Sequence, residues 1–309
     1  MFHSLVHLLT LAELGHHEVN HLHVYARGNH TGKPVMLLVP TFPCVTVLAS
    51  ISDEILTSFE ETHNLVFYDT RGVGRSSGSE PNAGWEGHVT DAVSVARWAV
   101  SYFAKENLTV WGYSFGTMLA MDASSRANDI VSKVILTNLK VDVQRSSFIM
   151  NQAIEQVWGL PTILTSQLPP EMVLNAALLG PFRYACMHQP RTIECFTGFL
   201  YPDVRMVFDV YGVEHLLPYP LQFAKCFVNV RNELPDLRLS SVSHVDAPLF
   251  IAHGRHDYID AATLVETAIA TNSLPSSSYT IEWMYESGHA PLVEEKERYM
   301  AVMRQFMVA

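Results

Sequence analysis

The sequence predicts an α/β protein whose mostly parallel central sheet carries helices on both faces and is interrupted by an inserted helical cap. Three observations support this fold class. Short, wholly apolar runs alternate with helical patterns in both halves of the chain, as in sheets built from βα units. This alternation stops in the middle of the chain. One predicted strand also leads through a Gly-x-Ser-x-Gly turn directly into helix formers. With 309 residues, 48% of them hydrophobic, the chain is long enough to bury such a core.

The first part of the chain is predicted to be a hairpin followed by alternating strands and helices. Its later strands are short and apolar, which suits burial on both faces of a parallel sheet. Its helices carry apolar side chains at helical spacing. The expected elements, in order, are a hairpin of Leu5–Glu13 and His21–Ala26 with its turn at Gly15–Asn20, strand Val35–Val39, helix Ser52–Phe59, strand Leu65–Tyr68, helix Thr90–Ala104, strand Thr109–Gly112, helix Met118–Ala123 and strand Val134–Thr137.

The pattern changes near Val141. From there to about Ser240 it is helical or irregular, is broken by prolines, and shows no alternating strand pattern. The βα rhythm then returns with strand Pro248–His253, helix Asp260–Ala270, strand Tyr279–Met284 and a closing helix Glu294–Met307. We therefore expect a core domain of residues 1–141 and 241–309 and a helical cap, or lid, of residues 142–240.

Charge and cysteine usage exclude several functions. The net charge is −11 and no basic stripe occurs, so neither nucleic acid nor an anionic membrane surface is expected as a partner. No run approaches 18 apolar residues, which predicts no membrane span, and residues 1–14 lack the basic start of a signal peptide. The four cysteines show neither C-x-x-C nor zinc spacing, which predicts reduced thiols, a cytoplasmic location and no metal site. They are Cys44, Cys186, Cys195 and Cys226.

The central motif is Gly112–Tyr113–Ser114–Phe115–Gly116, which lies between a predicted strand and a predicted helix. A serine at such a turn takes a strained backbone conformation, with its hydroxyl clear of the sheet edge. The N–H of Phe115, at the start of the helix, would face an anion that forms beside Ser114. The five-residue pattern is weak by itself, so an ordinary glycine-rich turn remains the alternative.

Further polar residues follow other predicted strands. Ligands of open α/β sheets bind outside the carboxyl ends of the strands. Gly254–Arg255–His256–Asp257 follows one late strand, and Ser287–Gly288–His289 follows the last strand. A serine, a carboxylate and a histidine therefore occur in the order Ser…Asp…His, each just beyond a strand. This placement predicts a catalytic triad of Ser114, Asp257 and His289.

Each residue type has its own chemical role in this prediction. A serine hydroxyl is a poor nucleophile at neutral pH, so the neutral imidazole of His289 must take its proton and later return it to the leaving group. Asp257 would hold the other ring nitrogen and stabilise the imidazolium. The backbone N–H groups of Phe42 and Phe115 would bind the oxyanion.

Several nearby polar residues have competing interpretations. Asp142 is a rival acid, because it lies just beyond the strand that follows the predicted helix of Ser114. Asp260 is expected to cap the next helix. Structural hydrogen bonds in the glycine-rich loop are expected for Asp69 and Arg71, and Trp85 and His88 are weaker candidates for the mouth of the site.

With these motifs in place, the chain resembles an α/β-hydrolase-fold serine hydrolase with a helical cap. The resemblance covers the whole sheet domain and rests on the three motifs that carry Ser114, Asp257 and His289. Tyr68–Asp69–Thr70–Arg71–Gly72–Val73–Gly74–Arg75–Ser76 resembles the Asp-x-Arg-Gly-x-Gly-x-Ser loop of the proline-iminopeptidase-like branch. That branch usually has His-Gly-Gly-Pro-Gly where this chain has Pro40–Thr41–Phe42–Pro43–Cys44, and its Trp-rich cap motif is not found here.

The resemblance implies an acyl-enzyme mechanism without a cofactor. The aromatic side chains of the insertion suit a small, mostly apolar ester, lactone or amide. The expected pocket residues are Thr41, Cys44, Tyr113 and Trp158. Three alternatives stay open: an aminopeptidase of the proline iminopeptidase type, a C–C bond hydrolase or biosynthetic enzyme, and a non-catalytic receptor with a hydrolase fold.

Overall fold

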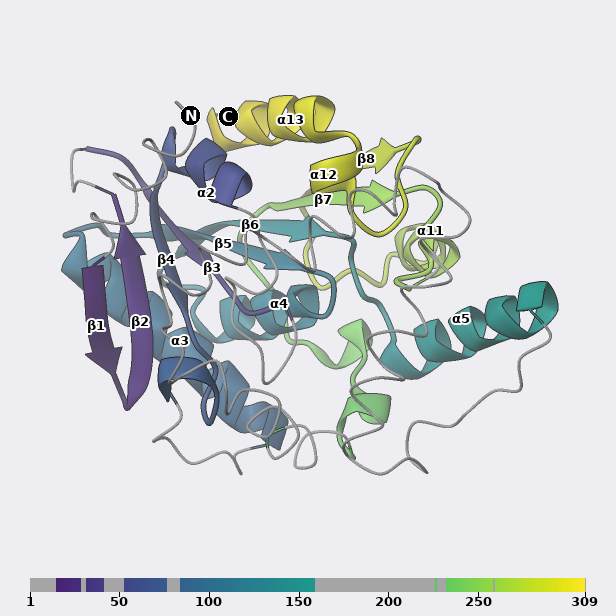
Figure 1. Cartoon of the computed structure of the whole chain (residues 1–309), viewed down its shortest axis with the longest axis horizontal. Coiled ribbons are helices and arrows are strands. Elements are labelled where there is room, and N and C mark those ends of the chain that lie inside the picture. The colour runs from purple at the N-terminus through teal and green to yellow at the C-terminus, as the bar shows by residue number, and fades with distance from the viewer. Residues whose placement is uncertain are drawn as a thin grey trace, which may run out of the picture.

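The computed structural model describes residues 15–28, 32–41, 53–76, 84–158, 226, 232–257 and 259–308. Within these residues, eight strands form one sheet in the order β1-β2-β4-β3-β5-β6-β7-β8 (Figure 1). β1 and β2 pair antiparallel with their neighbours and the remaining strands pair in parallel. The strands are β1 (Gly15–Val19), β2 (Leu22–Arg27), β3 (Val35–Leu38), β4 (Asn64–Tyr68), β5 (Leu108–Tyr113), β6 (Val131–Thr137), β7 (Leu249–Gly254) and β8 (Tyr279–Met284). The predicted α/β class with a mostly parallel central sheet is confirmed.

Helices cover both faces of the sheet. The described helices are α2 (Asp53–Glu60), α3 (Gly84–Tyr102), α4 (Gly116–Arg126), α5 (Val143–Trp158), α11 (Ala262–Ala270), α12 (Pro291–Glu294) and α13 (Lys296–Val308), with short 3₁₀ turns η2 (Gly74–Ser76), η4 (Leu234–Asp236) and η5 (Leu239–Ser241). Side chains of α3, α4 and α11 join the apolar cluster on one face, and those of α2, α12 and α13 join the cluster on the other. Figure 1 shows α2 and α13 on the side of the sheet opposite α3 and α4.

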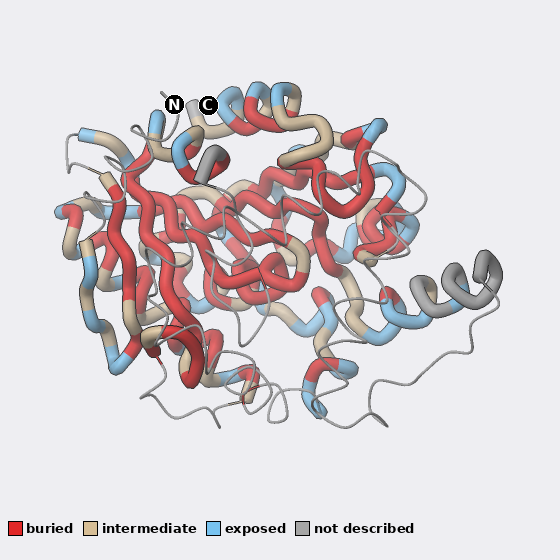
Figure 2. The backbone as a smooth tube through the Cα atoms, viewed as in Figure 1, coloured by how far each residue is buried: buried red, intermediate tan, exposed pale blue. Residues whose placement is uncertain are grey.

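The central strand β5 shows why apolar runs form this core. Its side chains alternate between the two faces, so Leu108 and Val110 pack into one cluster and Trp111 and Tyr113 into the other. All six residues of β5 are buried, and Figure 2 shows the same burial along the central strands. A strand buried on both faces needs apolar residues at every position, which explains the runs in the sequence.

The N-terminal hairpin has a different register from the predicted one. Gly15–Val19, most of the predicted turn, is strand β1, and the two-residue turn lies at Asn20 and His21. Both turn residues have positive φ, at 49° and 67°, as a tight hairpin turn requires. Asn20 therefore marks the turn, whereas Gly15 is the first residue of β1. The predicted strand Leu5–Glu13 lies outside the described residues.

Two helix predictions also need correction. The closing helix α13 begins at Lys296, two residues after the predicted start, because Glu295 is the non-helical C-cap of the short helix α12. α3 begins at Gly84, several residues before the predicted start. Its first turn is stabilised by the carboxylate of Glu233, which accepts from the N–H of Trp85 at 2.8 Å. A capping residue so distant in sequence leaves no local signal.

The insertion is described only at its two ends and at Cys226, so the predicted domain boundaries and the cap stay predictions. Cys226 is disulfide-bonded and completely buried. The prediction of reduced thiols is therefore wrong for this residue, and the reason is that a bridge between distant cysteines has no spacing signature. The other three cysteines lie outside the described residues.

Candidate active site

Ser114 occupies the strained turn that the sequence predicts. It lies between the end of β5 and the start of α4 and has a φ of 55°, in the left-handed region that L side chains rarely adopt. Its N–H donates to the carbonyl of Thr137 at 2.9 Å. A Cβ at Gly112 would lie 2.5 Å from the carbonyl oxygen of Gly116, so the turn needs glycine there. Ser114 is partly exposed between the buried residues Tyr113 and Phe115.

The segment after β3 packs directly against this turn. The N–H of Gly116 donates to the carbonyl of Thr41 at 3.1 Å, and a Cβ at Gly116 would lie 2.6 Å from the carbonyl oxygen of Pro40. Phe115 is the N-cap of α4, and the free N–H groups at the start of a helix are suited to bind an anion. Phe42 and Cys44 lie outside the described residues, and the side chain of Trp158, at the end of α5, is not described.

His289 and Asp257 form a buried hydrogen-bonded pair. The Nδ1 of His289 lies 2.9 Å from the Oδ2 of Asp257, and the residues are 5% and 3% exposed. The other carboxylate oxygen accepts from the N–H groups of Ile259 and Asp260 at 2.8 and 3.1 Å. A carboxylate at Nδ1 favours the tautomer whose proton is on Nδ1, which leaves Nε2 available as a base.

Each member of this pair changes the pKa of the other. Burial alone would raise the pKa of Asp257, but the charge and hydrogen bond of His289 outweigh it and lower that pKa to about 2. Burial likewise opposes a charged imidazole, but the Asp257 carboxylate outweighs it and raises the pKa of His289 above its usual 6.5. The pair therefore favours a positively charged ring, as needed after a proton transfer to His289.

The backbone of His289 is held by two further side chains. Its carbonyl accepts hydrogen bonds from the Tyr113 hydroxyl and from the Asn138 amide, both at 2.6 Å. The rings of Tyr113 and His289 have centroids 5.4 Å apart. Because Tyr113 directly precedes Ser114, these contacts bring the histidine loop to the serine turn. Tyr113 is only 2% exposed and supports the histidine loop through its hydroxyl, and its place in the substrate pocket stays a prediction.

Asn138 is a site residue that the sequence analysis missed. It follows the last residue of β6, has a φ of 52°, and accepts the N–H of Gly254 at 2.9 Å through its side-chain oxygen. It thereby joins the ends of β6 and β7 to the loop of His289. An asparagine just beyond a buried strand was the available signal, since asparagine tolerates left-handed backbone.

Asp260 does not cap the following helix as predicted. The N-cap of α11 is Ala261, and the fully buried carboxylate of Asp260 forms an ion pair with Lys140. Its Oδ2 lies 3.8 Å from the Nδ1 of His289. Among the described residues, Asp257, Asp260 and His289 are the one group whose donor atoms are close enough to hold a metal ion. The ammonium group of Lys140 already balances the second carboxylate there.

The rival acid Asp142 has a structural position. Its Oδ1 accepts from the N–H of Arg145 at 2.8 Å, at the start of α5, and its Oδ2 lies 3.7 Å from Arg238. Asp69 and Arg71 are structural, as predicted. Asp69 accepts from the Tyr25 hydroxyl and from the N–H of Arg75, and Arg71 pairs with the buried Asp91 through two hydrogen bonds.

Trp85 and His88 lie on α3 and are both buried. The indole N–H of Trp85 donates to Asp122 at 2.9 Å, and its ring meets that of Phe115 edge to face. Trp85 therefore braces the residue proposed for the oxyanion hole. Burial, with a smaller effect of Arg71, lowers the pKa of His88 to about 4, so its ring is neutral at pH 7.

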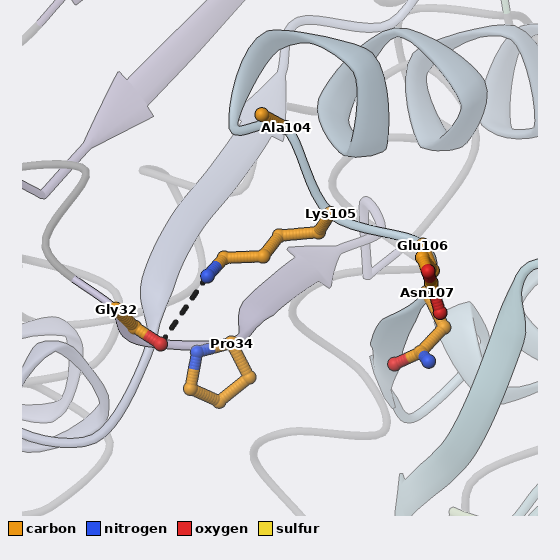
Figure 3. Close-up of a pocket in the computed structure, with 6 residues that line it drawn as sticks. All are labelled: Gly32, Pro34, Ala104, Lys105, Glu106 and Asn107. Atoms are coloured by element: carbon orange, nitrogen blue, oxygen red, sulfur yellow. Dashed lines mark hydrogen bonds between the residues drawn. The ribbon is translucent and has the colours of Figure 1, made fainter.

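A pocket of about 330 Å³ lies elsewhere on the molecule (Figure 3). It is lined by Gly32, Pro34, Ala104, Lys105, Glu106 and Asn107. These residues precede β3 and β5, so the pocket lies at the sheet edge opposite Ser114. The Lys105 ammonium donates across it to the carbonyl of Gly32.

A parallel sheet with a strained serine after β5, an acid after β7 and a histidine after β8 is the arrangement of an α/β hydrolase fold. The family model for this fold matches residues 34–190, and the chain belongs to the α/β hydrolase fold family. No protein of curated function matches it by sequence.

Solved structures with the same fold differ widely in sequence. A serine hydrolase from Cycloclasticus zankles is 14% identical, with a TM-score of 0.61 over 95% of this chain and 97% of that one. The 2-hydroxy-6-oxo-6-phenylhexa-2,4-dienoate hydrolase from Rhodococcus is 17% identical, with a TM-score of 0.61 over 96% and 99%. An epoxide hydrolase from Bacillus megaterium is 15% identical, with a TM-score of 0.58 over 96% and 100%.

None of the described helices is both long and apolar enough to span a bilayer.

Proposed function

We propose that this protein is a serine hydrolase that cleaves a small, mostly apolar ester, lactone or amide through an acyl-enzyme intermediate. The observation that carries the proposal is the buried His289–Asp257 pair, which Tyr113 connects to the strained turn at Ser114. Strain of this kind costs free energy and persists where function requires the geometry. A metal or cofactor is not needed for this chemistry.

The proposed reaction has two halves that use the same residues. As the Ser114 oxygen attacks the acyl carbon, its proton passes to Nε2 of His289, and the His289 ring then gives that proton to the leaving alcohol or amine. In the second half, water attacks the acyl carbon and gives its proton to His289. The bond between the acyl carbon and the Ser114 oxygen then breaks, and His289 returns the proton to Ser114 as the acid product leaves. Asp257 keeps the ring in the productive tautomer and stabilises its positive charge in both halves.

The proposed oxyanion hole consists of the N–H groups of Phe115 and Phe42. The position of Phe115 before α4 and the contact of Thr41 with Gly116 support this assignment, because they bring the segment after β3 to the serine turn. Removal of one such donor typically lowers kcat by about 100- to 1,000-fold.

The substrate class rests on the insertion, which we propose to be a helical cap of residues 142–240 over a core of residues 1–141 and 241–309. Its many aromatic residues favour an apolar acyl group. Thr41 is buried beside the serine turn, so it stays a candidate for the pocket. Cys44 and Trp158 stay predictions from the sequence.

Assays with different substrates distinguish the other functions that this fold supports. The solved structures named above include a 2-hydroxy-6-oxo-6-phenylhexa-2,4-dienoate hydrolase and an epoxide hydrolase, so the fold does not choose the reaction. Release of naphthylamine from a prolyl naphthylamide would support the aminopeptidase alternative. Hydrolysis of short acyl nitrophenyl esters, with no release of naphthylamine from the prolyl naphthylamide, would support the proposed function.

A cytoplasmic location stays a prediction. It rested on reduced cysteines, and the disulfide at Cys226 removes that argument because disulfides persist mainly in oxidising compartments.

The decisive experiment is covalent labelling with a fluorophosphonate probe. We expect the wild-type protein to be labelled at Ser114, which peptide mass spectrometry identifies. Ser114→Ala should abolish labelling, and His289→Gln should slow it on the order of 1,000-fold or more, because the hydroxyl then lacks its base.

Ser125→Ala is the matched control, because Ser125 lies on α4 and its hydroxyl donates to the carbonyl of Asp122 within the helix. It should be labelled at the wild-type rate. A wild-type protein that is folded but never labelled would favour the non-catalytic receptor and contradict the proposal.

A further inference from the structure

Asp260 is a buried carboxylate that the proposed reaction does not use. Its side chain is fully buried, and its Oδ2 lies 3.8 Å from the same His289 nitrogen that Asp257 contacts at 2.9 Å. Water screens charges poorly in such a place, so a second carboxylate at this distance acts strongly on the charge of the ring.

Lys140 balances this carboxylate from another part of the chain. Its ammonium group pairs with Oδ1 of Asp260 and lies 3.4 Å from the carbonyl of Ile259. The backbone N–H of Lys140 donates to the Thr117 hydroxyl, and that hydroxyl donates to the carbonyl of Ser114 at 2.7 Å. The pair therefore connects the loop after β7, which carries Asp257, to the serine turn.

We propose that Asp260 and Lys140 form a positioning pair that sets the charge balance at His289, with Asp260 favouring the protonated ring and Lys140 opposing it. This inference rests on the proposed role of His289 as the base. A single unpaired carboxylate at Asp260 would hold the proton on the ring too firmly, and the lysine limits that effect.

The other groups around His289 have separate roles. Asp257 orients the ring, and Tyr113 and Asn138 hold the backbone carbonyl. Among the described residues, His253 on β7 and Glu294 on α12 are further titratable groups near His289; Glu294 accepts from the N–H of Gly288. Burial opposes the charged ring, Asp257 and then Asp260 raise the pKa of His289, and Lys140 lowers it.

The test compares Asp260→Asn, Lys140→Met and the double variant. The pKa of His289 is read from the carbon-bound imidazole protons in protein labelled with ¹³C-histidine, with His289→Gln assigning the resonance. Loss of the carboxylate should lower this pKa and loss of the ammonium should raise it, each by at least about half a pH unit. In the double variant, the pKa of His289 should return close to its wild-type value.

The pH below which the rate of labelling by the fluorophosphonate probe falls should shift in the same directions as this pKa, since only the neutral ring accepts a proton. Asp129→Asn is the matched control, because Asp129 forms an exposed ion pair with Arg97 far from the site. It should leave both readouts unchanged. Circular dichroism establishes that each variant is folded.

Shifts of the same sign in the two single variants, or no shift in either, would overturn the inference. If one single variant does not fold, the sign of the shift in the other single variant and the return of the double variant toward the wild-type value decide. The imidazole titration does not depend on hydrolysis. A wild-type protein that is never labelled therefore contradicts the proposed function, whereas an unmoved titration contradicts this inference.

Discussion

At the residue scale, the two carboxylate oxygens of Asp257 contact two different parts of the chain. One oxygen contacts the ring of His289, and the other accepts hydrogen bonds from two backbone N–H groups of the turn before α11. A purely structural turn former would satisfy only the second set. The sequence identified Asp257 by its place after a strand, but only the structure shows that the side chain turns back toward the histidine.

The low pKa of Asp257 predicts a loss of stability in acid. Burial opposes it, but His289 lowers this pKa from 3.8 to about 2 in the folded protein, so the ionised pair stabilises the fold above pH 4. This contribution is lost as the pH falls from about 4 to about 2, because in that range the unfolded chain takes up a proton at Asp257 that the folded state does not bind.

The measurement is urea unfolding of wild type and Asp257→Asn between pH 6 and pH 3. The wild-type advantage should be roughly 2 kcal/mol at pH 6 and roughly half of that at pH 3. An advantage that does not change over this range would contradict the assignment.

At the element scale, the end of β7 and the loop after β8 touch without space for a side chain. A Cβ at Gly254 would lie 1.8 Å from the carbonyl oxygen of Gly288, which is backbone and cannot move aside cheaply. A Cβ at Gly288 would meet its nearest neighbour at 3.7 Å, an ordinary contact. The two glycines therefore differ sharply in what they tolerate.

We expect Gly254→Ala to lower the free energy of unfolding by about 3 kcal/mol or more, since the strand end and the histidine loop have to separate. Gly288→Ala, the matched control in the same contact, should cost no more than about 1 kcal/mol. Chemical denaturation measures both. Equal costs for the two variants would show that the close approach is not maintained in solution.

At the scale of the whole molecule, the disulfide at Cys226 predicts a dependence of stability on redox state. Cys226 is disulfide-bonded, and its buried side chain joins the main apolar cluster. Dithiothreitol should lower the free energy of unfolding by about 2–4 kcal/mol. Thermal unfolding followed by circular dichroism measures the change.

Cys226→Ala provides the control for this prediction. The variant should be less stable than wild type without reductant and should lose less stability than wild type when dithiothreitol is added. Alkylation of the unreduced wild-type protein should leave Cys226 unmodified. Modification of all four cysteines without reductant would contradict the bridge.

Much of this protein is determined by its sequence. Strands buried on both faces need apolar runs, and a strained strand-to-helix turn needs glycines around its serine, so local composition predicted the sheet and the turn at Ser114. The rule that sites lie at the carboxyl ends of parallel strands grouped Ser114, Asp257 and His289 as the candidate triad.

Tertiary structure alone decided the rest. Glu233 sets the start of α3, Asn138 holds the histidine loop, and Lys140 pairs with Asp260, each through a contact between residues far apart in sequence. Such contacts leave no period, spacing or local propensity in the chain. They depend on which surfaces the packed sheet brings together, and a sequence pattern reports only on near neighbours.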